Sequence, residues 1–191
     1  MIRIGILGDI GAGKSYVAKK FGYPVFNADD EVALLYHKEK KIFNKLKKIL
    51  PKHIHFFPVD KKENSRSILT NESNLGKIVK IINLKIIKKL KIFLKKNKNK
   101  KFIILDIPLL LENKINNKKD ILIYVESKKS MIQKKLTKRK NFNQKILKKF
   151  KSIQFPINYK KKKSQYILKN DFTEKTIKIG INNILKKIVY K

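Results

Sequence analysis

The most constraining feature of the sequence is the segment Gly8-Asp9-Ile10-Gly11-Ala12-Gly13-Lys14-Ser15, which matches the pattern G-x-x-x-x-G-K-[ST] in full. A short apolar run over 2–7 precedes it, and a helical pattern over 13–21 follows it. Glycines in such a strand–loop–helix let successive backbone N–H groups point at phosphate oxygens. The lysine reaches the β- and γ-phosphates, and the hydroxyl binds Mg²⁺. The segment therefore predicts a nucleotide phosphate site, with Lys14 and Ser15 in these roles.

The rest of the chain alternates between short apolar runs and longer amphipathic stretches. We expect further strands at 24–26, 102–105, 121–125 and 166–168, and helices at 42–50, 75–94, 130–138, 143–153 and 173–189. A further helix begins near Asp29 or Asp30, either of which can cap it. We expect loop at 53–63 and a solvated lysine run at 160–163. This alternation predicts one α/β domain, a parallel sheet with helices on both faces.

Composition removes several classes of function. The chain has 191 residues, 42% of them apolar, which is enough for a real core. It has no cysteine, so disulfides, thiolate metal sites and cysteine nucleophiles are excluded. Three histidines are too few for a confident zinc site. Because the apolar runs are far too short for a membrane span and the N-terminus leads straight into the glycine loop, we expect a cytoplasmic protein.

The formal net charge of +35 suggests a partner rich in phosphate, such as a nucleic acid. However, only Arg3, Arg66 and Arg139 are arginines; the other basic residues are lysines spread along the chain. Proteins that read bases favour arginine for its planar fork. We therefore interpret the charge as compositional bias and expect no dedicated nucleic-acid partner. A basic nucleic-acid-binding ATPase remains the alternative from another class.

The loop binds a nucleotide but does not name the reaction. Asn117-Lys118-Lys119-Asp120 matches the guanine-reading pattern Asn-Lys-x-Asp of GTPases. Asparagine and lysine are so common in this chain that the match is weak, and the strand expected before it is missing. The size fits the small nucleoside and nucleotide kinases better.

Two carboxylates follow predicted strands, at the sheet edge where ligands bind. Asp29 could accept the proton of an attacking hydroxyl, or could serve only as a helix cap. Asp106 could hold the water shell of Mg²⁺, or could be a turn residue before Pro108. The basic stretch from Gln133 to Arg139, continuing to Gln154 and Lys160, suits a lid over phosphates, although a solvated face has the same composition.

Several segments together resemble the dephospho-coenzyme A kinase family, in the right order from Ile4 to about Leu185. These are the glycine loop, Pro-Val-Phe-Asn-Ala-Asp, Ile-Pro-Leu-Leu-Leu-Glu, Gln-x-Pro-x-x-x-Lys and Tyr-Ile-Leu-Lys-Asn. The resemblance implies phosphorylation of the ribose 3′-hydroxyl of dephospho-coenzyme A by ATP, the last step of coenzyme A synthesis. It implies a single P-loop NTPase-type three-layer domain, with its core at about 1–29, 101–136 and 161–191. A helical acceptor-binding region would span about 30–100, and a lid about 137–160.

Carried over position by position, the resemblance makes Asp29 the catalytic base, with Lys14 and Arg139 on the ATP phosphates. Asn170 would lie near the adenine. The other ATP-binding residues would be Gly11, Ala12, Gly13, Ser15 and Tyr16. Arg66 would belong to the acceptor site, which Pro108, Leu109 and Glu112 would line or support. Independently of the resemblance, the loop motif and the strand-end position make Ser15 and Asp106 the expected Mg²⁺ residues, directly or through water. The expected partners are the small molecules ATP and dephospho-coenzyme A, and we expect a monomer.

The chain departs from the family pattern at a few positions. The first aspartate of the family's Asp-Ala-Asp is Asn27 here, and an arginine four residues after the second is Ala33. Other departures are Asn83-Leu84 for a His-Pro pair, Ser164-Gln165 for an Ala-Asp pair, and Tyr16 for a serine or threonine. These departures concern recognition of the acceptor more than phosphoryl transfer.

Overall fold

The structure is a computed structural model that describes residues 1–71, 73–139 and 142–190. The chain forms two compact units. The first unit contains residues 1–27, 97–142 and 153–191, and the second contains residues 28–96 and 143–152. The division of a single domain into a core, an acceptor-binding region and a lid stays a prediction.

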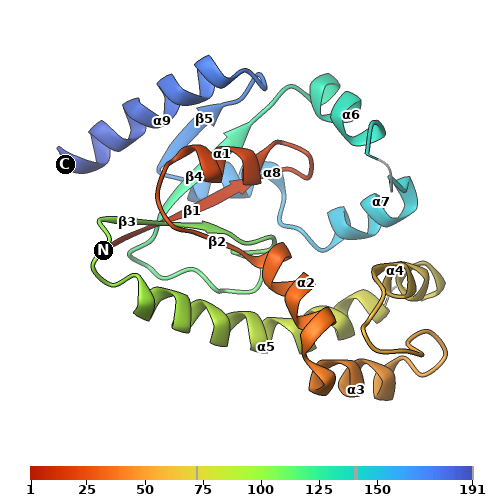
Figure 1. The fold of residues 1–191 in the computed structure, drawn as a ribbon. Helices are drawn as coiled ribbons and strands as arrows, with labels where there is room; N and C mark the ends of the chain where they lie inside the picture. The colour runs from red at the N-terminus through yellow and green to blue at the C-terminus, as the bar shows by residue number, and fades with distance from the viewer. Residues whose placement is uncertain (72, 140–141, 191) are drawn as a thin grey trace. The chain divides into compact units, whose positions relative to one another are not determined.

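A parallel five-stranded sheet forms the centre of the first unit, in the order β2-β3-β1-β4-β5 (Figure 1). The central strand β1 pairs with β3 through Gly5 and Leu105, and with β4 through Gly5 and Leu122. The strands are β1 (Ile2–Gly8), β2 (Val25–Asn27), β3 (Phe102–Asp106), β4 (Ile121–Glu126) and β5 (Tyr166–Lys169). All five residues of β3 are buried, as expected for a strand covered on both faces.

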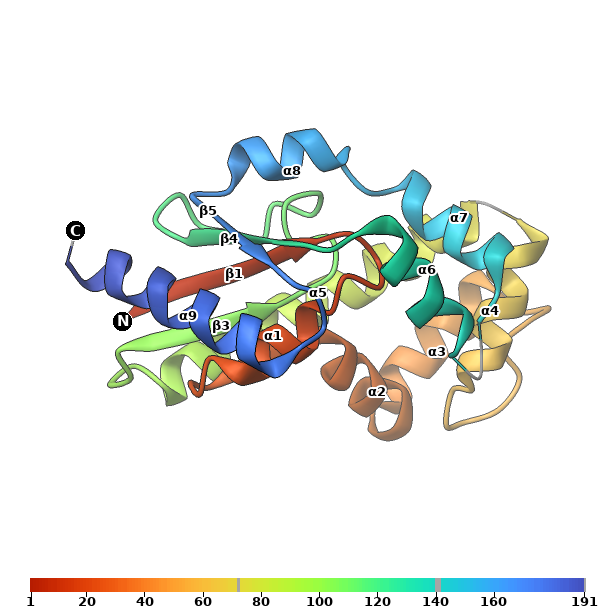
Figure 2. The same ribbon diagram turned by 90° about the horizontal axis from the view of Figure 1, so that it is seen from above.

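Helices cover both faces of this sheet. Figure 2 shows α1 (Lys14–Lys20) and α9 (Glu174–Val189) on one face and α8 (Ile157–Lys163) on the other. A further helix, α6 (Lys129–Thr137), follows β4. The fold predicted from the sequence, a parallel sheet with helices on both faces, is confirmed. No helix among the described residues is both long enough and apolar enough to cross a membrane.

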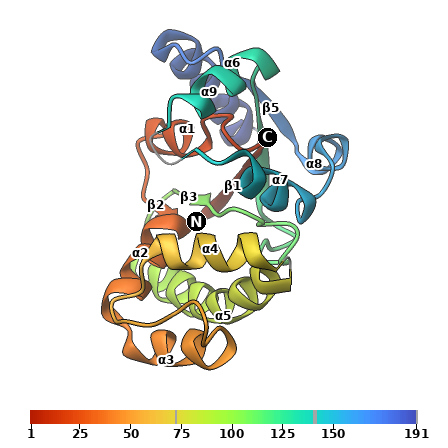
Figure 3. The ribbon, with the colours of Figure 1, turned by 90° about the vertical axis from the view of Figure 1, so that its right-hand side faces the viewer.

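The second unit is entirely helical. Its longest helix, α5 (Ser73–Lys96), buries a stripe of apolar side chains at helical spacing: Ile78, Ile82, Ile86 and Leu90. Figure 3 shows the shorter helices beside it, and α2, α3 and α4 all contact α5. Their bounds are α2 (Ala28–Lys38), α3 (Lys40–Ile49) and α4 (Lys61–Thr70), with α7 (Gln144–Ser152) against α4.

Two local predictions about helix starts need correction. Helix α2 begins at Ala28, so Asp29 and Asp30 lie in its first turn and neither caps it. Carboxylates are still favourable there, because the first turn carries unpaired N–H groups. Helix α4 was not predicted, since its sequence KKENSRSILT has little apolar periodicity. It is started by Asp60, whose side chain accepts a hydrogen bond from the backbone N–H of Lys62.

The prediction of a solvated run at 160–163 is correct for Lys162 and Lys163, which are exposed, but wrong for Lys160. These residues form the last turn of α8, and Lys160 is only 5% exposed. A lysine is buried this deeply only when its charge is compensated. In this case the compensating groups are side chains at positions 112 and 154, which the local sequence pattern does not reveal.

Candidate nucleotide site

The loop between β1 and α1 has the backbone that phosphate binding requires. Gly11 and Gly13 have φ values of 87° and 85°, in the left-handed region that glycine adopts without strain. Space is also limiting at both positions. A Cβ on Gly11 would lie 2.8 Å from Cγ of Leu136, and one on Gly13 would lie 2.6 Å from Nδ2 of Asn170. Glycine is therefore required at positions 11 and 13 for two reasons: the left-handed backbone conformation and the lack of room for a side chain.

Residues that follow β4 and β5 support the loop through hydrogen bonds. The carbonyl of Ala12 accepts hydrogen bonds from Nδ2 of Asn170 at 2.8 Å and from Oγ of Ser127 at 3.1 Å. Asn170 is buried, and its backbone N–H donates to the carbonyl of Glu126 at 2.7 Å. Its Oδ1 accepts from the backbone N–H of Phe172. Sequence reasoning missed Ser127, whose only signal is a hydroxyl directly after an apolar strand.

The side chain of Lys14 lies back over the loop. Its Nζ donates to the carbonyl oxygens of Asp9 at 2.9 Å and Gly8 at 3.3 Å. Neutral carbonyls hold an ammonium less strongly than phosphate oxygens do. Ser15 and Tyr16 follow in the first turn of α1 and are exposed. The Tyr16 ring lies 5.3 Å from Nζ of Lys20.

A polar pair joins the ends of β2 and β3. Asn27 and Asp106 are partners in the parallel ladder, and Nδ2 of Asn27 donates to Oδ2 of Asp106 at 3.1 Å. Asp106 is 3% exposed. The amide at position 27 therefore supports the buried carboxylate, where a second carboxylate would repel it.

The donors available for Mg²⁺ are hard oxygens, as this ion prefers. They are the hydroxyl of Ser15 and the carboxylate of Asp106. Within the described part of the chain, there is no cluster of three or more His, Cys, Asp or Glu side chains that could hold a metal ion. One hydroxyl and one carboxylate fit Mg²⁺, which usually keeps several waters and takes one or two protein ligands together with substrate phosphates.

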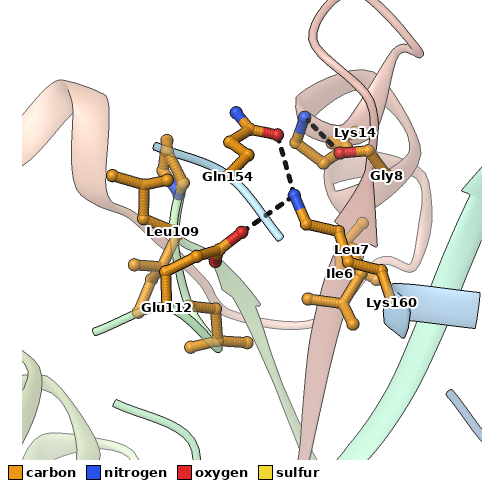
Figure 4. Close-up of a pocket in the computed structure, with 11 residues that line it drawn as sticks. Ile6, Leu7, Gly8, Lys14, Leu109, Glu112, Gln154 and Lys160 are labelled. Atoms are coloured by element: carbon orange, nitrogen blue, oxygen red, sulfur yellow. Dashed lines mark hydrogen bonds and ion pairs between the residues drawn. The ribbon is translucent and has the colours of Figure 1, made fainter. Parts of the chain in front are cut away.

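A pocket lies beside the loop, between Gly8, Lys14 and the segment after β3 (Figure 4). Pro108, Leu109 and Glu112 line it. Leu109 has a φ of 58°, an uncommon conformation for a residue with a side chain and one that tends to occur at functional sites. The predicted acceptor residues of this segment are thus brought together beside Lys14.

A larger open cavity of about 560 Å³ lies on the side of the loop where Asn170 and Ser127 contact it. Its walls are formed by the ends of β4 and β5, the loops that follow them, and one residue each of α6 and α9. Its lining residues are Glu126, Ser127, Lys128, Met131, Lys169, Asn170, Asp171 and Thr176. Asn170 therefore contacts the phosphate loop and lines this cavity.

Three predicted site residues remain: Asp29, Arg66 and Arg139. Asp29 is exposed in the first turn of α2, two positions beyond Asn27, and belongs to the second unit. Arg66 is exposed on α4 in the same unit. Arg139 is exposed in the first unit, just after α6. Their functional roles stay predictions.

The segment 117–120, which matches the guanine-reading pattern of GTPases, forms an ion pair and a hydrogen bond within the protein. Nη2 of Arg3 donates to Oδ2 of Asp120 at 2.9 Å, and its Nε lies 2.9 Å from Oδ1. The same carboxylate accepts from the backbone N–H of Asn117. Burial raises the pKa of Asp120, and the hydrogen bond from Asn117 and the charge of Arg3 oppose that shift. Asp120 precedes β4, at the opposite end of the sheet from the glycine loop, so it cannot read a base there.

Comparisons with known proteins give a consistent result. The sequence model of the family described as dephospho-CoA kinase matches residues 2–175. The dephospho-CoA kinase of Wolbachia sp. subsp. Brugia malayi (strain TRS) is 29% identical over 190 residues, covering 97% of each chain. Among solved structures, TT1252 from Thermus thermophilus is similar with a TM-score of 0.75 at 21% identity, covering 97% of each chain. Dephospho-CoA kinase from Campylobacter jejuni has a TM-score of 0.60 at 20% identity, covering 97% of this chain and 96% of that one.

Proposed function

Since the chain belongs to the dephospho-CoA kinase family, we propose that it transfers the γ-phosphate of ATP to the ribose 3′-hydroxyl of dephospho-CoA. The products are CoA and ADP, and the reaction is the final step of CoA synthesis. The observation that carries this proposal is the phosphate loop at 8–15, which Asn170 supports through a hydrogen bond to Ala12. The loop lies within the residues that the family model matches, 2–175.

The reaction forms a bond between the 3′-oxygen and the γ-phosphorus and breaks the bond from that phosphorus to the β–γ bridging oxygen. The proton of the hydroxyl goes to the carboxylate of Asp29, and ADP leaves with the bridging oxygen. The exposed position of Asp29, soon after the end of β2, supports this role, since an acceptor must reach the base from solvent. Little covalent chemistry is required of the protein, so positioning and charge supply most of the rate enhancement.

Cationic groups of the chain neutralise the charge of the transferring phosphoryl group. Lys14 exchanges its hydrogen bonds to the Asp9 and Gly8 carbonyls for stronger ones to phosphate oxygens. Arg139 contacts the phosphates from the basic segment after α6. Ser15 and Asp106 would hold Mg²⁺, which would supply positive charge to neutralise the phosphate groups.

The two cavities beside the loop suit the two substrates. The cavity lined by Asn170 and Met131 would take the base of ATP, because it adjoins the loop at the end of β5. The pocket lined by Pro108 and Leu109 has a volume of only about 20 Å³, so it would contact one group of the acceptor and not enclose it. Arg66 is a further proposed acceptor residue. We propose that the chain acts as a monomer, which light scattering at working concentration would test.

A coupled ADP-release assay tests the reaction. ATP and Mg²⁺ are supplied with dephospho-CoA, adenosine or AMP in separate reactions. We expect ADP release that depends on dephospho-CoA alone. Release that depends on adenosine or AMP would instead identify a nucleoside or nucleotide kinase, and no acceptor-dependent release from protein shown to bind ATP would contradict the proposal.

A further inference from the structure

Lys160 is a buried lysine in the wall of the pocket that also contains Lys14. Its side chain is 7% exposed, and that of its partner Glu112 is 9% exposed. Nζ of Lys160 lies 3.0 Å from Oε1 of Glu112 and donates to Oε1 of Gln154 at 2.7 Å (Figure 4). Oε1 of Glu112 also accepts from the backbone N–H of Phe155 at 2.8 Å. The ammonium is thus held firmly between two side chains.

The hydrogen bonds of this ammonium are incomplete. An ammonium has three N–H donors, and within the described residues the side chain of Lys160 has two acceptors, on Glu112 and Gln154. A buried donor without a partner is costly, so such groups are usually satisfied in the working state of a protein. The third donor is therefore available to a ligand.

The charge of the pocket indicates the chemistry of that ligand. The charged side chains that line it are Lys14, Lys160 and Glu112, which together carry one net positive charge. Gly8, at the start of the phosphate loop, lines the same pocket. An oxygen of a phosphate group complements both the net charge and the free donor.

We propose that Lys160 is a second anion-binding lysine of this site, which donates its third N–H to a phosphate oxygen of a bound substrate. Glu112 and Gln154 are positioning residues, because they fix the ammonium rather than contact the substrate. This proposal rests on the proposed function and deepens it. The phosphate could belong to ATP or to the diphosphate of the acceptor, and the two sources are separated by experiment.

The test compares Lys160→Met with Lys162→Met, which removes an exposed lysine two positions further along the same helix. Because Lys160→Met leaves Glu112 buried without its partner, the double variant Glu112→Gln/Lys160→Met is measured as well. In the double variant, the neutral amide at position 112 still accepts the hydrogen bond from the Phe155 N–H and leaves no unpaired charge buried. Steady-state kinetics with dephospho-CoA, thermal unfolding, and separate calorimetric titrations with a non-hydrolysable ATP analogue and with dephospho-CoA are recorded for each protein.

We expect Lys160→Met to lower kcat/KM by about 10- to 100-fold, as for loss of a charged hydrogen bond, and Lys162→Met to stay within about twofold of the wild type. The double variant should recover thermal stability but not activity. Weaker binding in one titration identifies the substrate concerned, and a lower kcat with both affinities retained places the contact on the transferring phosphoryl group. Recovery of activity together with stability in the double variant would overturn the proposal. Inactive wild-type protein would refute the proposed function instead.

Discussion

The side-chain amide of Asn170 donates a hydrogen bond of 2.8 Å to the carbonyl of Ala12, 158 residues earlier in the chain. This contact connects the end of the last strand to the middle of the phosphate loop. The loop therefore depends on a residue that its own sequence motif does not include.

Replacing Asn170 with alanine should weaken ATP binding. Within the described part of the chain, the Ala12 carbonyl would then keep one hydrogen bond, from Ser127 at 3.1 Å. Loss of one buried hydrogen bond corresponds to about five- to tenfold in affinity. Calorimetric titration with an ATP analogue measures the change, and Ser127→Ala is the comparison, with a smaller expected loss. Unchanged affinity in Asn170→Ala would show that the loop keeps its shape without this support.

Gly13→Ala should abolish ATP binding, whereas Gly22→Ala should not. Both glycines have a positive φ, 85° and 72°. A methyl group on Gly13 would lie 2.6 Å from Nδ2 of Asn170, but one on Gly22 would meet nothing within 4 Å. Gly22→Ala therefore measures the cost of the left-handed backbone conformation without a steric clash, about 1 kcal/mol of stability. Equal losses of ATP binding in the two variants would mean that backbone strain alone, and not the close packing against Asn170, explains the requirement for glycine.

Asn64→Leu should stabilise the protein. Asn64 is 6% exposed on α4, and neither Nδ2 nor Oδ1 has a hydrogen-bond partner among the residues that the structure describes. Removing two unsatisfied polar atoms should raise the free energy of unfolding by about 1–3 kcal/mol, or Tm by several degrees.

Asn74 provides the matched control for this stability prediction. It has the same 6% exposure, but its Nδ2 donates to the carbonyl of Ser67 at 2.9 Å. Asn74→Leu should therefore destabilise the protein in the same thermal unfolding experiment. A lower Tm for Asn64→Leu would contradict the interpretation.

Asp29→Ala should retain ATP binding and lose most turnover, because it removes the proposed proton acceptor. General-base catalysis contributes about 10²- to 10⁴-fold, which sets the expected drop in kcat. Asp30→Ala changes the neighbouring carboxylate in the same helical turn and controls for an effect on α2 itself. Near-normal turnover in Asp29→Ala would remove this residue from the mechanism.

The parts of the fold that follow periodicity could be predicted from sequence. The glycine loop, the buried strand at 102–106 and the long helix α5 all have local patterns that decide their structure. Helix α4 and the burial of Lys160 could not be predicted, since each depends on distant partners. The Asp60 cap starts α4 without an apolar stripe, and Glu112 compensates the charge of Lys160.

In the candidate site, too, some residues follow from a local pattern and others depend on distant parts of the chain. The motif at 8–15 identifies Lys14 and Ser15 directly, because the loop's chemistry is local. Ser127, which supports the loop, is brought to it only by the parallel order of β1 and β4. The pairing of Asn27 with Asp106 likewise follows from the register of β2 and β3, which no local pattern specifies.

The most direct test of the central claim is the position of the new phosphate on the product. Phosphorus NMR of the reaction of the wild-type protein with ATP, Mg²⁺ and dephospho-CoA should show a phosphomonoester on the ribose 3′-oxygen, formed in equal amount with ADP. Phosphate appearing at another oxygen, or free phosphate released in place of a new ester, would contradict the account.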